Sequence, residues 1–81
     1  MENNTIIEAF DGVATMLAQL DPEKVLTLHA TKEMSARVAF LVNKKKDEQI
    51  SWDETLELER FLALDLLISL AKARAHRILA V

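Results

Sequence analysis

The sequence predicts an all-α protein: a small four-helix domain with a long C-terminal helix that dimerises. Its composition points to helices, since the 81 residues include one Gly and one Pro, with 51% hydrophobic and 28% charged residues. Its last third, from Ser51 onward, is a stretch that no Gly or Pro interrupts. Helix-capping residues divide the rest of the chain into shorter helices. We therefore predict one helical domain over residues 1–81, because a chain of this length suits a single domain.

The first predicted helix begins at Asn4 or Thr5, either of which can cap it, and ends near Leu20. Its apolar side chains recur at helical spacing along one face, and its polar side chains lie opposite. Gly12 falls on the polar side, where it weakens the helix by about 1 kcal/mol relative to Ala. The face expected to be buried comprises Ile6, Phe10, Val13, Leu17 and Leu20.

The second predicted helix is very short. Asp21 suits its N-cap and Pro22 suits its first position, so the two residues end one helix and begin another. The turns that follow, over residues 23–28, supply a few apolar side chains to bury.

The third predicted helix begins after Thr31, which caps it, and ends in the basic residues 44–46. Glu33 and Arg37 are spaced for an i,i+4 ion pair. The connection to the last helix contains no Gly, so a left-handed C-cap would fall on Asn43 or Asp47, or be absent. Because that connection is short, we expect an antiparallel hairpin, with the first helix packed across it. The inward face comprises Met34, Val38, Leu41 and Val42.

The fourth predicted helix begins with a capping box, in which Ser51 and Glu54 exchange side-chain and amide hydrogen bonds. Its middle is apolar round most of the circumference. A helix of this kind is central in its fold or shared between subunits. We therefore expect a homodimer, in which a second chain covers what the three shorter helices leave exposed. The polar residues in the middle of this helix form one narrow stripe, which comprises Asp65, Ser69, Lys72 and His76.

Residues 30–75 resemble a group of short, mostly uncharacterised all-helical bacterial proteins, some of which are labelled antitoxin-like. The resemblance lies in residues 30–38 (ATKEMSARV), in Ile50 and Ser51 before an acidic helix start, and in residues 70–75 (LAKARA). It implies a helical fold and a regulatory role, and it assigns no functional residue.

Several classes of protein are disfavoured by composition. The chain has no cysteine and a net charge of −3, so it offers no thiolate site and no overall attraction to nucleic acid. The N-terminus lacks the basic start of a signal peptide, and the longest apolar run contains Asp65 and is too short for a bilayer. We expect a soluble, cytoplasmic protein.

No pattern of catalytic or cofactor-binding residues is present, so we expect a non-enzymatic protein without cofactor or metal. The histidines, His29 and His76, lie far apart in sequence, and neither has a second histidine at helical spacing. The acidic residues at the start of the last helix are explained by the helix dipole.

The main functional hypothesis is a protein–protein interaction module, either an adaptor or an antitoxin-like regulator. Apolar side chains outside the best core stripes indicate an interface with a second chain or another protein. The predicted interface residues are Phe40, Leu58, Phe61, Leu62, Leu66 and Ser69.

The alternative hypothesis is a nucleic-acid-binding regulator. Clustered cations gain affinity for a phosphate backbone through counterion release. Both basic clusters close helix C-termini, however, where the dipole already favours cations, and no aromatic residue accompanies them. The candidate contacts are Lys44, Lys45, Lys46, Lys72, Arg74 and Arg77.

Overall fold

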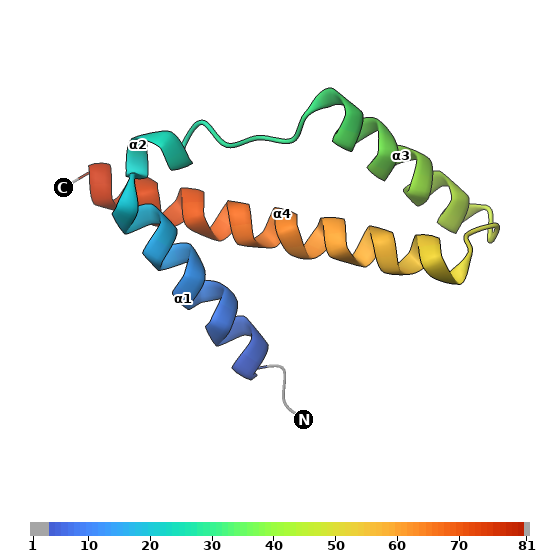
Figure 1. The fold of residues 1–81 in the computed structure, drawn as a ribbon, viewed down its shortest axis with the longest axis horizontal. Helices are drawn as coiled ribbons and strands as arrows, with labels where there is room; N and C mark the ends of the chain where they lie inside the picture. The colour runs from blue at the N-terminus through green and yellow to red at the C-terminus, as the bar shows by residue number, and fades with distance from the viewer. Residues whose placement is uncertain (1–3, 81) are drawn as a thin grey trace. The chain divides into compact units, whose positions relative to one another are not determined.

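The computed structural model describes residues 4–80, and this range contains four α-helices and no strand (Figure 1). The all-α fold and the long C-terminal helix predicted from the sequence are confirmed. The second helix is a single short turn. The helices are α1 (Asn4–Leu20), α2 (Pro22–Val25), α3 (Lys32–Lys46) and α4 (Trp52–Leu79).

The helices pack as two compact units, and α4 contributes to both. One unit, here named the α1–α2 unit, is Met1–His29 with Asp65–Val81 and contains α1, α2 and the C-terminal half of α4. The other, named the α3 unit, is Ala30–Leu64 and contains α3 and the N-terminal half of α4.

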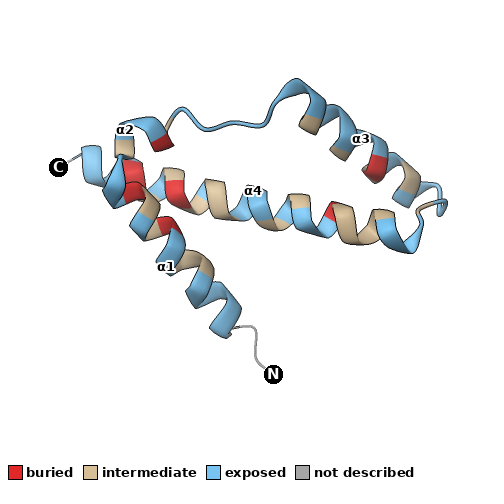
Figure 2. Ribbon diagram, viewed as in Figure 1, coloured by how far each residue is buried: buried red, intermediate tan, exposed pale blue. Residues whose placement is uncertain are grey.

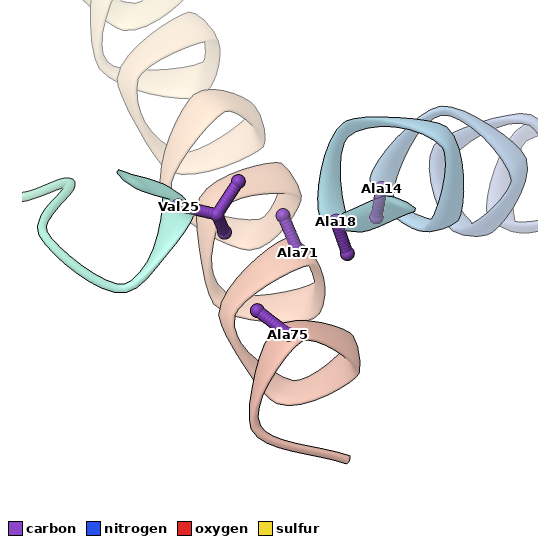
Figure 3. Close-up of a cluster of buried hydrophobic side chains, with 5 residues drawn as sticks. All are labelled: Ala14, Ala18, Val25, Ala71 and Ala75. Atoms are coloured by element: carbon purple, nitrogen blue, oxygen red, sulfur yellow. The ribbon is translucent and has the colours of Figure 1, made fainter. Parts of the chain in front are cut away.

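Alanine dominates the core of the α1–α2 unit. Ala14 and Ala18 of α1 are fully buried, as are Ala71 and Ala75 of α4, and Val25 of α2 completes the cluster at 6% exposed. Figure 3 shows these side chains where the three helices meet. Because alanine is small, the helix backbones can approach closely. Larger side chains border the cluster and are half-buried: Leu17, Leu26, Leu67 and Leu70.

The buried face of α1 differs from the predicted one. Ile6 and Leu20 were expected in the core, but they are 61% and 76% exposed, and Val13 is 45% exposed. Much of α1 is coloured as exposed in Figure 2. The apolar arc of α1 is wider than the contact with α4 needs. The contact uses the alanine edge of that arc and leaves the edge with large side chains outside.

Side chains begin α2 and α3 where the sequence predicts them. Asp21 Oδ1 accepts a hydrogen bond from the Lys24 amide at 3.1 Å, and Pro22 is the first residue of α2. The Thr31 hydroxyl accepts from the Met34 amide at 3.1 Å. Both bonds satisfy amides that no carbonyl within the helix can reach. The predicted N-caps of α2 and α3 are confirmed.

The capping box that begins α4 is also confirmed. The Ser51 amide donates to Glu54 Oε1 at 3.0 Å, and the Glu54 amide donates to Ser51 Oγ at 3.1 Å. Two amides at the start of the helix are thereby satisfied by one pair of residues.

Glu48 makes the turn between α3 and α4. Its φ of 59° lies in the left-handed region, and it is the non-glycine residue that does so in the described chain. The expectation that Asn43 or Asp47 would take this conformation is wrong. The helix continues through Lys46, so the left-handed position falls later in the chain.

The hydrogen bonds of this turn are those of a Schellman motif. The Glu48 amide donates to the Lys45 carbonyl at 3.1 Å, and the Gln49 amide donates to the Lys44 carbonyl at 2.8 Å. These bonds satisfy carbonyls at the end of α3. The chain therefore reverses within a few residues, although it has no glycine there.

Helices α3 and α4 form the predicted antiparallel hairpin within the α3 unit. Arg37, early in α3, binds Glu57, whereas Lys44, late in α3, binds the earlier Glu54. Leu41 of α3 is fully buried, and Leu58 of α4 is 4% exposed.

Candidate interaction surfaces

The predicted interface residues divide between the two units. Within the α3 unit, Phe40 is 47% exposed and Leu62 is 55% exposed, Phe61 is half-buried, and Leu58 is buried by its own chain. Within the α1–α2 unit, Leu66 is 46% exposed and Ser69 is exposed. Leu58 thus supports its unit from within, while Phe40, Leu62 and Leu66 present apolar surface to solvent.

Phe40 lies between two cations on α3. The Arg37 guanidinium is 5.2 Å from the ring centroid, and the Lys44 ammonium is 5.3 Å from it. Both distances are within the range of a cation–π interaction. Residues 37, 40 and 44 share one side of α3 because they are spaced by three and four residues. The same two charged groups that lie near the ring also bind carboxylates of α4.

The two ion pairs of this surface differ in geometry. Arg37 donates from both Nε and an Nη atom to the two carboxylate oxygens of Glu57, each at 2.8 Å, which makes a bidentate pair. Lys44 Nζ makes a single 2.8 Å bond to Glu54. Arg37 was expected to pair with Glu33 in its own helix; it binds Glu57 across the hairpin instead, where the fork of the guanidinium matches the carboxylate.

The Lys44 hydrogen bond and the Ser51 amide together lower the pKa of Glu54 to about 2. The hydrogen bond from Arg37 lowers the pKa of Glu57, and the same bond raises the pKa of Arg37. These carboxylates are therefore ionised at neutral pH. They hold the cations of α3 in place and are poorly suited to act as general acids, which must carry a proton.

Two of the six candidate nucleic-acid contacts bind carboxylates of the chain itself. Lys44 pairs with Glu54, and Arg74 pairs with Asp11 of α1. These pairs draw the two cations away from solvent, and their side chains are 31% and 30% exposed. The remaining candidates are exposed or half-buried: Lys45, Lys46, Lys72 and Arg77.

A shallow hollow on α4 lies within the α3 unit. It is lined by Glu57, Arg60, Phe61 and Leu64, and its volume is about 240 Å³. Small-molecule pockets usually enclose about 300–1,000 Å³ and surround the ligand. This hollow is smaller and its walls belong to one helix, so its shape suits a side chain of another protein better than a free ligand.

The two histidines are exposed, and one lies in a connection while the other lies on α4. Among residues 4–80 no three side chains of His, Cys, Asp or Glu gather closely enough to hold a metal ion. Within that same range, no helix has the length and apolar character that crossing a bilayer requires.

Several residues of α1 that the sequence predicts to be buried lie at its surface, among them Ile6, Val13 and Leu20. Met16, which flanks them, is 61% exposed on the same side of the helix. The signal that marks this side is the position of the alanines. Ala14 and Ala18 mark the face that a close neighbour requires, so the large side chains beside them are displaced from the contact.

No protein-family model, curated protein or solved structure matches the chain.

Proposed function

We propose that the protein is a non-enzymatic interaction module. It forms a helical homodimer and binds a protein partner, and the apolar side chains that α4 leaves exposed contribute to these contacts. An adaptor or an antitoxin-like regulator is one concrete form of such a module. The proposed site of action is the cytoplasm.

The observation that carries the proposal is an inversion of side-chain size between core and surface. Four of the five residues in the buried cluster of the α1–α2 unit are alanines. In the same unit, Leu66 is 46% exposed, and Ile78 and Leu79 are 40% and 44% exposed. Large apolar side chains gain most from leaving water, about 1.5–3 kcal/mol for each one fully buried. A second polypeptide that covered them would recover this free energy.

The α3 unit supports the same proposal. Leu62 is 55% exposed and Leu64 is 42% exposed, beside the hollow at Phe61. A partner helix can place its apolar face against such a surface and insert one side chain into the hollow.

The test uses Leu66→Asp, which places a charge on the exposed apolar surface of α4. The matched control is His76→Asp, which introduces the same acidic side chain at an exposed position on the polar stripe of the same helix. We expect tagged wild-type protein to retain a partner from its native cells, Leu66→Asp to lose that partner, and His76→Asp to keep it. Circular dichroism must show the same helix content in all three proteins.

Light scattering of the purified chain tests the homodimer separately. A monomer at micromolar concentration, together with no partner that depends on Leu66, would contradict the proposed function.

A further inference from the structure

Helix α1 carries a regular apolar row that the rest of the chain does not cover. The residues of the row are spaced by three, four, three and four positions. This is the a/d spacing of a coiled coil, which keeps one side of a helix apolar along its whole length. All of the residues are exposed, with Ile6 and Met16 at 61% and Leu20 at 76%. The a/d row is Ile6, Ala9, Val13, Met16 and Leu20.

The opposite side of α1 holds the helix to its own chain. Ala14 and Ala18 are buried against α4 and α2, and Asp11 pairs with Arg74 of α4. At 100° per residue these positions lie about 120–180° round the helix from the middle of the a/d row. The row therefore faces away from the contact with α4.

One flank of the a/d row has room for a neighbouring helix. Gly12 lies beside Met16 on the helix surface, and a Cβ atom added at Gly12 would meet nothing within 4 Å. Ala9 within the row is also small. A second helix can therefore approach closely along this flank without displacing a side chain.

The a/d row and its flanks carry no charge. The acidic residues of α1, Glu8 and Asp11, lie on other sides of the helix, and α1 contains no basic residue. In coiled coils, charges beside the apolar row attract oppositely charged partners and repel like ones. Because α1 has no such charges, the row does not favour a charged partner. Two copies of the row also do not repel each other. The flanking positions are Thr5, Phe10, Gly12, Leu17 and Gln19.

We propose that the a/d row of α1 pairs with the same row of a second copy of this chain, as a short two-helix coiled coil about a two-fold axis. Such an interface is self-complementary, since the same residues meet from both sides. The β-branched residues Ile6 and Val13 at a positions suit a two-stranded assembly. This inference rests on the proposed homodimer and places its interface on α1 in place of α4. The exposed leucines of α4 are then left for the protein partner.

The contact of α1 with α4 favours this pairing. Isolated helices shorter than about 12–15 residues are marginally stable in water even when rich in alanine, and α1 is only slightly longer and contains Gly12. The alanine contact and the Asp11–Arg74 pair already hold α1 as a helix before it meets the second copy. Less ordering is then required on association, which strengthens binding through a small interface. The short row nevertheless predicts a dimer that dissociates on dilution.

Val13 is the position to test, because it is the middle residue of the a/d row. It lies near the two-fold axis whether the helices run parallel or antiparallel. Val13→Lys and Val13→Glu each place like charges together in a self-paired dimer, so we expect each alone to dimerise at least about tenfold more weakly than wild type. An equal mixture should recover the dimer, because lysine then faces glutamate. Glu8→Gln is the control, since it changes the net charge as Val13→Lys does but lies off the row.

Sedimentation velocity over a range of concentrations measures these populations, and circular dichroism checks that α1 stays helical. The same pair of substitutions at Met16 replaces the Val13 pair if those variants lose helix content. A dimer that survives the Val13 substitutions and is lost on Leu66→Asp would overturn the pairing through α1 while leaving the proposed function intact. A mixture of the two variants that stays monomeric would also overturn it. A wild-type monomer at every concentration would overturn both the pairing and the proposed homodimer.

Discussion

The close contact between α1 and α4 predicts that a larger side chain at Ala71 destabilises the protein. Ala71 is fully buried against a neighbour that also presents alanine. If the three extra carbons of a leucine found room, they would stabilise the fold by about 0.8 kcal/mol each. Because the alanine cluster leaves no such room, Ala71→Leu must instead push α1 outward, at a cost of about 1–3 kcal/mol. Ala71→Leu would thus raise the free energy of unfolding if the leucine found room, and it lowers it if α1 is displaced.

Thermal unfolding followed by circular dichroism measures the difference. For a chain of this size, 1 kcal/mol corresponds to about 4–8 °C in Tm, so Ala71→Leu should melt at least about 4 °C below wild type. Ala73→Leu is the control, because Ala73 is exposed on the same helix and leucine has nearly the helix propensity of alanine. If Ala71→Leu melted at or above the control, the close packing of alanines would be refuted.

Three further predictions concern the α3 unit. Glu48→Gly should raise the free energy of unfolding by about 0.5–1 kcal/mol. It removes left-handed strain of about 1–2 kcal/mol, and the entropy that glycine adds to the unfolded chain costs less than this. The control Asp47→Gly, at φ −85°, should lower the free energy of unfolding in the same urea titration. The pKa of Glu54 is lowered in the folded state, so its contribution to stability is complete above pH 4.5 and is lost as the pH falls to about 2. Over that range the Tm of wild type should therefore fall more steeply than that of Glu54→Gln, and parallel curves would contradict this. Leu41→Ala should cost about 2–5 kcal/mol, because Leu41 is fully buried, and a smaller loss in urea unfolding would mean that the hairpin collapses to fill the gap.

Local features of the fold were predictable because they depend on residues close in sequence. The Ser51–Glu54 box, the Asp21 cap and the Thr31 cap each join residues three positions apart. The hydroxyl or carboxylate needs only the start of a helix to find its amide partner. Four helices, their order and the antiparallel hairpin follow from these signals and from the lengths of the connections.

Contacts between distant residues were not predictable in the same way. Arg37 has an acidic residue at helical spacing in Glu33, and nothing in the sequence indicates that Glu57 offers a better carboxylate across the hairpin. Glu48 is equally hard to foresee. Its left-handed conformation follows from the residue at which α3 stops, and propensity alone would have assigned it to Asn43 or Asp47.

The face of α1 was mispredicted for a physical reason that also bears on the candidate site. Ile6, Val13 and Leu20 lie at the centre of the apolar arc of α1. The helical spacing of apolar residues therefore predicts that they are buried. The fold instead places the alanine edge against α4, where backbones meet closely. Which edge is buried depends on the shape of the neighbour, which the sequence of α1 does not contain.

The composition of the alanine cluster connects stability to assembly. Each buried alanine methyl contributes less than about 1 kcal/mol, whereas each large apolar side chain of the a/d row would contribute about 1.5–3 kcal/mol on full burial. Association of α1 with a second copy would therefore release free energy comparable to that which the alanine cluster provides within one chain. A binding equilibrium of that size adds to the stability of the folded state by mass action. The Tm and the helix content of the purified chain should consequently be interpreted together with its concentration.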